Sequence, residues 1–358
     1  MKILHFVNEN RLSWVEPYIQ LISYLDASGV DNILMCNPGG TLSAKARAKG
    51  IKVLEYKPVL PAVPLFSRKA GEIILKTAPD IIHTRLSSAS LIGGYWGKRL
   101  DIPVISTIDK FAKIKYNRFS DVSVAVSSSI KDWMKGYGYK SEKIEVIPNP
   151  VDVKFYSLNQ EVRDETRKKW GIEDNEIVIA GAGRFEHEKG FDVLIKAVER
   201  LPRGMPFRLW LAGDGPEKEK LKSLVRKYSF LEDKMEFWGF VDDIRPFLWA
   251  SDIFVLPSRE PESFGLILLE AMASGLPVIA TLFGGPLDIV DEACGWFVPP
   301  DDIDGLHSVL QNAMNRELLS QKGKGSLKKI AMFDVISVGD RYYDLYLKNS
   351  GKKARFSQ

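Results

Sequence analysis

The 358-residue chain is poor in cysteine and histidine, with two and four residues, and it lacks any apolar run approaching the length of a membrane span. Cys36 and Cys294 lie far apart in strand-like surroundings, which predicts buried, reduced thiols rather than a disulfide framework. Only five residues separate Lys2 from Asn8, too few for a signal-peptide core. The sequence also has no His, Cys and Asp cluster with metal-ligand spacing. These absences predict a cytoplasmic chain without a bound metal.

The positive charge is unevenly distributed. Residues 1–150 carry 21 Lys and Arg against 13 Asp and Glu, whereas the remainder carries 29 against 33. A basic half favours an anionic partner for that half, although an ordinary solvated surface explains the same numbers. A nucleic acid is disfavoured, since no recognised binding motif is present.

Short apolar strands alternate with helical patterns along the whole chain. Seven strand patterns precede residue 150 and five follow it, and this alternation is typical of parallel, doubly wound α/β sheets. The chain is too long for one ordinary core, so we expect two domains. Two prolines in PNPVD, at Pro148–Asp152, stiffen the crossing between them.

One stretch, Pro257 to Ala280, has the strongest functional pattern. A buried strand, DIFVLPS, precedes it, and its composition predicts a helix over Phe264–Ala273. A helix that begins after a strand and a loop offers free N–H groups to an anion. We expect Ser263 to cap this helix and Gly265 to let a ligand approach the backbone. Glu262 and Glu270 bracket the helix start, although their spacing alone arises by chance in many charged helices.

A second pattern, GAGRFEHEKG, follows an apolar strand at Gly181. Gly181 and Gly183 are typical of a dinucleotide fingerprint, but Glu186 stands where a third glycine is required, so an NAD site is disfavoured. Arg184 and Lys189 lie between strand and helix. A planar guanidinium and a point charge favour a diphosphate over two solvated surface charges.

Together these motifs resemble the retaining glycosyltransferases of family four. The matching segments occur in the family's order: PNPVD, GAGRFEHEKGFDVLIKA, LAGDGPE, WGFVDDI, ESFGLILLEAMASGLPVIA and FGG. The resemblance covers essentially all of the second half and is looser in the first. It implies the GT-B fold, with two doubly wound Rossmann-like domains facing a central cleft. Residues 1–150 would form the acceptor-side domain, 151–334 the nucleotide-sugar domain, and a helix at about 335–348 would cross back onto the first.

The resemblance also implies roles for individual residues. Arg184 and Lys189 would hold the leaving diphosphate, Glu262 the sugar hydroxyls and Glu270 the ribose. The implied donor-binding set is Arg184, Lys189, Gly213, Val241, Glu262, Ser263, Phe264, Gly265, Leu266 and Glu270. The implied catalytic set is Glu262, Arg184, Lys189 and Asp109. No cofactor beyond the sugar donor and no metal is expected.

Candidates on the acceptor side are Asn8, Asn10, Arg85 and Asp109, which follow or end strands at the ligand edge of the first sheet. Relatives usually have a histidine where Asp109 stands, and we expect neighbouring lysines, among them Lys110 and Lys113, to favour its charged form. His83 is interpreted as a satisfied core residue. The segment Val59–Lys76 is interpreted first as a helix packed on the sheet and second as a contact with an acceptor or a membrane surface.

The sequence thus predicts a retaining, metal-independent glycosyltransferase. It would move a sugar from a nucleoside-diphosphate sugar to an anionic saccharide or glycolipid, in cell-surface polysaccharide or lipopolysaccharide synthesis, with a peripheral contact at the inner face of the membrane. Two alternatives stay open. One is a non-catalytic nucleotide-sugar-binding or scaffold protein of the same fold. The other is a nucleotide-sugar epimerase, which the ESFGLILLE pattern disfavours.

Overall fold

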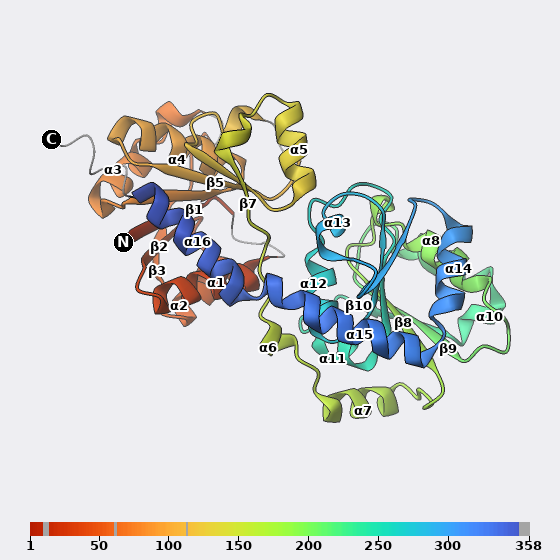
Figure 1. Cartoon of the computed structure of the whole chain (residues 1–358). Helices are drawn as coiled ribbons and strands as arrows, with labels where there is room; N and C mark the ends of the chain where they lie inside the picture. The colour runs from red at the N-terminus through yellow and green to blue at the C-terminus, as the bar shows by residue number, and fades with distance from the viewer. Residues whose placement is uncertain (10–13, 61–62, 112–113, 351–358) are drawn as a thin grey trace. The chain divides into compact units, whose positions relative to one another are not determined.

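The computed structural model describes residues 1–9, 14–60, 63–111 and 114–350. The chain divides into two compact units, the first made of Met1–Pro150 together with the chain from Phe333 on, the second of Val151–Met332 (Figure 1). Each unit holds one parallel sheet, with seven strands in the first and six in the second. The predicted α/β class with two doubly wound sheets is therefore confirmed. Among the described residues, no helix is both long and apolar enough to cross a membrane.

The first sheet has the strand order β3-β2-β1-β4-β5-β6-β7. All seven predicted strands form, because each is a short apolar run bounded by turn residues. Their bounds are β1 Lys2–Val7, β2 Asp31–Cys36, β3 Lys52–Glu55, β4 Ile81–Arg85, β5 Val104–Ile108, β6 Val122–Ala125 and β7 Ile144–Val146. The order reverses beside β1, so β1 and β4 meet at the switch point where such sheets bind ligands.

Helices cover both faces of the first sheet, as right-handed crossovers require. One face carries α1, α2 and α16, and the other carries α3, α4 and α5 (Figure 1). Their bounds are α1 Val15–Ala27, α2 Thr41–Ala48, α3 Arg68–Thr77, α4 Ser87–Leu100, α5 Ser128–Gly136 and α16 Val335–Ser350, with short 3-10 helices η1 Pro64–Phe66, η2 Ile114–Tyr116 and η3 Ser141–Lys143. The last helix, α16, packs on α1 and β4 and buries Tyr342 and Tyr346.

Close packing of α4 on the first sheet depends on its glycines. A Cβ on Gly97 would lie 2.2 Å from Val104 Cγ2, and one on Gly93 would lie 2.6 Å from Thr84 Cγ2. Neither neighbour is the free end of a flexible chain, so only glycine lets this helix approach the strands so closely.

The second sheet has the order β10-β9-β8-β11-β12-β13. Its strands are β8 Ile177–Ala182, β9 Phe207–Ala212, β10 Met235–Gly239, β11 Ile253–Leu256, β12 Val278–Thr281 and β13 Gly295–Val298. The five predicted strands are confirmed, but β13 was missed, because its four residues, GWFV, are few and begin with a glycine that favours a turn. The order again reverses, between β8 and β11.

Two layers of helices enclose the second sheet (Figure 1). α8, α9 and α14 pack on one face, whereas α7, α11, α12 and α15 lie on the other. The helices are α6 Val153–Tyr156, α7 Gln160–Lys169, α8 Phe191–Glu199, α9 Lys218–Arg226, α10 Ser229–Glu232, α11 Arg245–Ala250, α12 Leu266–Ala273, α13 Pro286–Ile289, α14 Ile303–Ala313 and α15 Arg316–Ile330, with η4 His187–Lys189 and η5 Ala331–Phe333. A core including Phe185, Phe191, Phe207 and Leu211 fills the space between α8 and the strands.

Candidate functional site

The residues predicted to bind the donor all follow strands at the carboxyl edge of the second sheet. Arg184 and Lys189 follow β8, Gly213 follows β9 and Val241 follows β10. The remaining six follow β11 or lie on α12. These four strands are neighbours in the order β10-β9-β8-β11. Ligands of open α/β sheets bind at this edge, where the strand order reverses.

Lys189 and Glu262 meet at this edge from two different loops. The Lys189 Nζ donates to Glu262 Oε1 at 2.5 Å, and the Ser258 hydroxyl donates to the same oxygen at 2.7 Å. The Lys189 side chain is 25% exposed and that of Glu262 16%, so both reach solvent. An ammonium has three N–H donors, of which one is used here. The structure thus brings together one basic and one acidic residue of the predicted donor set.

Arg259 ties the loop that carries Lys189 to two other loops. Its Nη1 and Nη2 donate to the two carboxylate oxygens of Asp192 at 2.7 and 2.8 Å, Nη1 also donates to the His187 carbonyl at 2.9 Å, and Nε donates to Asp301 Oδ1 at 2.5 Å. The Arg259 backbone N–H donates to the Glu188 carbonyl at 2.7 Å. Sequence reasoning missed this residue. The only signal was its place inside the PSREPESFG motif.

The same contacts control the charge of Asp192. Burial alone would raise the pKa of its carboxyl, but the hydrogen bonds from Arg259 and Lys196 outweigh burial and hold the pKa far below its ordinary value. Asp192 therefore stays ionised at neutral pH and keeps the guanidinium of Arg259 in place.

Backbone contacts fix the loop that carries Glu262. The Gly285 N–H donates to the Glu262 carbonyl at 2.7 Å. A Cβ on Gly284 would lie 2.4 Å from that carbonyl oxygen, and one on Gly285 would lie 2.3 Å from the Cα of Phe264. Backbone atoms cannot rotate away, so this approach requires glycine at both positions. The backbone of the FGG segment therefore packs directly against the loop that carries Glu262.

The helix after this loop begins later than predicted. α12 starts at Leu266, and Gly265 takes the cap position with a φ of 103°. The predicted start at Phe264 and the predicted cap at Ser263 are therefore wrong, because only glycine adopts this backbone conformation readily. Phe264 is buried, while Leu266 is half-buried at the first turn. The first backbone N–H groups of α12 still lie at the carboxyl edge of the sheet.

Glu270 lies one turn further along α12, in a different environment. Burial raises the pKa of its carboxyl to about 7, and a hydrogen bond with the Tyr156 side chain acts in the opposite direction. The Tyr156 carbonyl is held by Trp249 Nε1 at 2.8 Å and Ser274 Oγ at 3.2 Å. Tyr156 was another residue that sequence reasoning missed, since nothing in its spacing from PNPVD marks it as a partner of Glu270.

Three predicted donor residues stand apart from the Lys189–Glu262 pair. Arg184 is 76% exposed and pairs with Glu186. The Gly213 N–H donates to the Gly239 carbonyl at 2.7 Å, and a Cβ on Gly213 would lie 1.9 Å from the Gly183 carbonyl oxygen. Val241 is half-buried beside the exposed Phe240. Gly213 thus contacts residues at the ends of two neighbouring strands, whereas Arg184 and Val241 lie at the edge of the predicted donor site.

In the first unit, Arg85 and Asp109 form a buried ion pair. The Arg85 Nε donates to Asp109 Oδ2 at 3.1 Å, and Nη2 donates to Asp109 Oδ1 and to Asn149 Oδ1. The exposed fractions of the two charged side chains are 2% and 8%. Arg85 also lies over the rings of Trp14 and Tyr18, at 4.4 and 4.9 Å. Asp109 was expected to face lysines, but its partner is Arg85, and Lys113 lies outside the described residues.

His83 and Asn8 make hydrogen bonds within the first unit. His83 Nδ1 contacts the Tyr346 hydroxyl at 2.5 Å and Nε2 contacts Thr107 Oγ1 at 2.7 Å, so it is a satisfied core histidine. Burial lowers its pKa well below the usual value. Asn8 Oδ1 accepts from the Ala89 N–H, in the first turn of α4, at 3.1 Å. Asn10 lies outside the described residues.

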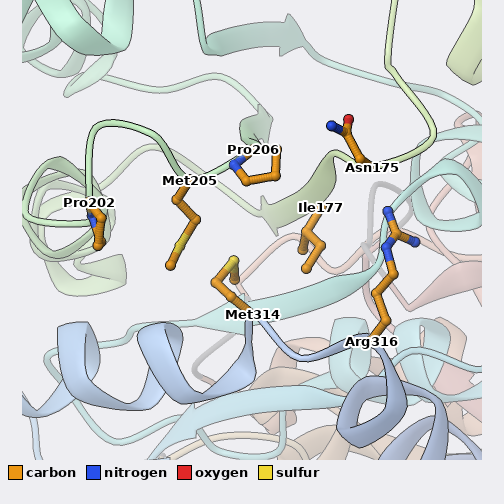
Figure 2. A pocket seen from close by; sticks show the side chains of 7 residues that line it. All are labelled: Asn175, Ile177, Pro202, Met205, Pro206, Met314 and Arg316. Atoms are coloured by element: carbon orange, nitrogen blue, oxygen red, sulfur yellow. The ribbon is translucent and has the colours of Figure 1, made fainter.

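A pocket of about 380 Å³ lies elsewhere on the second unit. Its lining residues lie before β9, before and at the start of β8, or between α14 and the start of α15. Figure 2 shows Met205 and Met314 pointing toward one another across it. Arg316 donates to the carbonyls of Asp174 and Glu176. The pocket is therefore at the amino edge of the sheet, opposite the predicted donor residues. Within the described part of the chain, no group of three His, Cys, Asp or Glu residues is arranged to hold a metal ion.

Comparisons with known proteins agree with this fold. Residues 162–326 match the family described as "Glycosyl transferases group 1", and residues 18–155 match "Glycosyltransferase Family 4". Two lipopolysaccharide core biosynthesis glycosyltransferases of Rhizobium meliloti (strain 1021) are similar over nearly their whole length. LpsE is 29% identical over 96% of this chain and 98% of its own, and LpsD is 25% identical over 99% and 100%.

The fold is also that of a solved structure. The crystal structure of Anabaena HepE in complex with UDP superposes with a TM-score of 0.87, at 20% identity, over 97% of this chain and 100% of HepE. The family matches together extend over most of both units. The chain therefore belongs to family four of the glycosyltransferases, enzymes that use nucleotide sugars, and has the GT-B fold.

Proposed function

We propose that this chain is a retaining glycosyltransferase that moves a sugar from a nucleoside-diphosphate sugar to a saccharide or glycolipid acceptor, in cell-surface polysaccharide or lipopolysaccharide synthesis. One observation carries the proposal. Lys189 and Glu262 are in contact across the loops that follow β8 and β11, directly before the first turn of α12. A cation, a carboxylate and free helix N–H groups in one place suit a diphosphate joined to a sugar.

The reaction breaks the bond between the anomeric carbon and the β-phosphate oxygen. The acceptor hydroxyl oxygen forms the new bond to that carbon on the same face, and its proton passes to the leaving diphosphate, so configuration is retained. Negative charge grows on the bridging oxygen as the bond breaks. Lys189, Arg184 and the amides of residues 264–266 would stabilise this charge. These cations compensate the diphosphate, so the proposed reaction needs no metal ion.

Other residues would orient the donor. Glu262 would accept hydrogen bonds from sugar hydroxyls and lie near the positive anomeric centre. Glu270 would accept from the ribose hydroxyls, and the main chain at Val241 would contact the base. The cation at position 189 and the carboxylate at 262 neutralise each other in the free protein, which keeps both side chains in place before the donor binds.

The relatives narrow the choice of donor and acceptor to test. HepE binds UDP in its crystal structure, which makes a uridine nucleotide the first donor to test. The two Rhizobium relatives act in lipopolysaccharide core synthesis, which favours an anionic saccharide acceptor. The excess of basic residues over residues 1–150 agrees with such an acceptor and with work at the cytoplasmic side of a membrane.

Donor hydrolysis tests the proposal most directly. The full chain is incubated with UDP-, GDP- and ADP-sugars, and release of nucleoside diphosphate is followed without an acceptor. Slow release with one donor is the expected result.

Calorimetric titration of UDP and UDP-sugar then separates the roles of the two carboxylates. Glu270→Ala should weaken the binding of both ligands, whereas Glu262→Ala should weaken only the binding of the sugar nucleotide. The reverse pattern would exchange the two roles.

A second function is favoured by one observation. Both oxygens of Asp109, the acceptor-side candidate for catalysis, accept hydrogen bonds from Arg85 within the core of the first unit. A protein that binds a nucleotide sugar without transferring it, as a scaffold does, has no need of a reactive group there. Tight donor binding without any release of nucleoside diphosphate would support this second function.

A further inference from the structure

A cluster of large apolar side chains lies exposed on the first unit, outside the predicted site. Leu65 and Phe66 of η1 are 63% and 62% exposed, and Val59, Leu60, Val63 and Leu75 are exposed as well. Seventeen large hydrophobic side chains are exposed among the described residues, and six of them fall within residues 59–75. Single exposed apolar residues are ordinary, but a contiguous group marks a surface that contacts something.

The cluster is held in place by contacts to α4. Trp96 Nε1 donates to Ser67 Oγ at 2.9 Å, and Ser67 in turn donates to the Pro64 carbonyl. A Cβ on Gly71 would lie 2.6 Å from the Trp96 ring, so α3 packs directly on that indole. Ala70 and Ile74 are buried on the same side of α3. The inner side of the segment is therefore packed, and its outer side presents Leu65, Phe66 and Leu75.

Basic side chains surround these apolar groups. Arg68, Lys69 and Lys76 are exposed on α3, with Glu72 as the one exposed acid of that helix. Arg99 of α4 lies 5.9 Å from the centre of the Trp96 ring and is also exposed. Residues 57–119 carry eleven Lys and Arg against four Asp and Glu, of which Arg85 and Asp109 pair with each other inside the unit. The exposed side chains next to the apolar group, four basic and one acidic, thus have a net positive charge.

We propose that η1 and α3, with Arg99 beside them, form a docking surface for an anionic lipid membrane. The apolar side chains would enter the boundary between headgroups and acyl chains, as on other interfacial helices. The long Lys and Arg side chains would keep their charges at the headgroups. Each basic residue near an anionic surface contributes about a fivefold gain in binding. The surface goes beyond the proposed reaction, because it would bind lipid without donor or acceptor.

The charge pattern favours lipid over a second copy of this chain. A second copy would place the four basic residues of one surface against those of the other, and like charges across an interface weaken binding. An anionic bilayer accommodates protruding aliphatic and aromatic side chains together with basic ones, without a matching groove. The lipid headgroup therefore complements both features of this surface.

Vesicle sedimentation tests the proposal with the full chain. Phosphatidylcholine vesicles with and without phosphatidylglycerol serve as probes, at low and at physiological salt. We expect at least tenfold stronger binding to the anionic vesicles, weakened by salt. The double variant Leu65→Glu/Phe66→Glu should reduce this binding at least tenfold, and Arg68→Glu/Lys69→Glu should reduce it similarly at low salt.

A matched control is available on the other face of the same unit. Ile336 and Leu347 of α16 are 56% and 49% exposed, so Ile336→Glu/Leu347→Glu introduces the same charges into the same unit. The two added carboxylates should weaken binding of this control to anionic vesicles by charge repulsion alone. The measured loss should lie within about twofold of that electrostatic effect. Melting temperature and UDP binding of every variant report folding and the second unit separately, so failure of docking is distinguishable from failure of the proposed reaction.

Three outcomes would overturn the proposal. Binding that is equal for neutral and anionic vesicles would remove the role of charge. Full binding by Leu65→Glu/Phe66→Glu would remove the role of the apolar residues. A wild-type chain that is dimeric by light scattering, and that this double variant converts to a monomer without effect on vesicles, would assign the surface to a second copy instead.

Discussion

The carboxyl edges of the two sheets carry similar residue types in different environments. In the first unit, Arg85 and Asp109 are nearly inaccessible and satisfy each other. In the second, Lys189 and Glu262 form an equally close pair that solvent reaches. A buried pair cannot exchange its partner without leaving a charge in an apolar interior, whereas an accessible pair can. The comparison indicates that the first pair holds the fold and that the second is available to a ligand.

The comparison is tested most severely by Arg85→Ala. Removal of the guanidinium leaves Asp109 buried without its cationic partner, which should cost about 3–5 kcal/mol of unfolding free energy. Urea unfolding measures this cost, with Arg47→Ala, which breaks the exposed pair with Glu55, as a control expected to change stability by less than about 1 kcal/mol. Arg85→Met/Asp109→Leu should recover most of the loss. Equal, small effects of both single variants would abolish the distinction between the two edges.

The second unit should respond in the opposite way to Lys189→Ala. The free energy of unfolding should change little. The transition-state stabilisation measured by kcat/KM for donor hydrolysis should fall by about 2–4 kcal/mol, the effect of removing one donor to a developing anion. Lys218→Ala is the matched control, because Lys218 also pairs with a carboxylate, that of Asp214, at a loop after a neighbouring strand. Wild-type turnover by Lys189→Ala would rule out its assignment to the diphosphate.

Arg259 should act through Lys189. Arg259→Ala removes the side-chain hydrogen bonds to the His187 carbonyl and to Asp192. We expect the transition-state stabilisation measured by kcat/KM to fall by about 1.5–3 kcal/mol, the value of a hydrogen bond to a charged group. A double-mutant cycle separates positioning from general destabilisation. In the Lys189→Ala background, Arg259→Ala should add little to the loss of kcat/KM. Fully additive losses would show that Arg259 acts independently of the lysine.

The smallest effect concerns the pH dependence caused by Glu270. With a pKa of about 7, the carboxylate fraction rises about tenfold between pH 6 and pH 8, so binding of UDP-glucose should strengthen up to about tenfold if the ribose requires the ionised form.

The pKa of Glu270 is raised in the folded state, so the unfolded chain loses this proton at a lower pH. Unfolding free energy should therefore fall as pH rises from about 4.5 to about 7 and level off above.

Glu270→Gln is the control for both measurements. The glutamine has no titratable proton, so the variant should show a flatter pH profile of UDP-glucose binding and of stability than the wild type. An identical pair of binding profiles would place the titrating group elsewhere.

Much of the fold could be predicted from the sequence, because buried parallel strands are apolar runs between turn residues. The exceptions are local. β13 has only four residues, and α12 starts at Leu266 because the backbone at Gly265 has a positive φ that composition does not reveal. The roles of the two domains and of the individual donor residues stay predictions.

Side-chain partnerships were harder to predict than strands. Arg85 and Asp109 were both named as candidates, but their pairing depends on the register of β4 against β5, which sets Arg85 beside Thr107. Arg259 contacts Asp192 and Asp301, which lie 67 and 42 residues away in sequence. Tyr156 reaches Glu270 only because α6 packs on α12. Such contacts form only in the assembled fold, so local sequence patterns do not predict them.

The two cysteines have a practical consequence for spectroscopy. Cys36 and Cys294 are fully buried, and burial raises the pKa of both thiols, that of Cys36 to about 11. A thiol reacts with maleimides as the thiolate, so both should be inert toward dyes at neutral pH. The natural chain is thus already a background for site-specific labelling. One introduced surface cysteine in each unit would give a donor–acceptor dye pair, and energy transfer between them would measure the separation of the two labelled positions with and without a ligand.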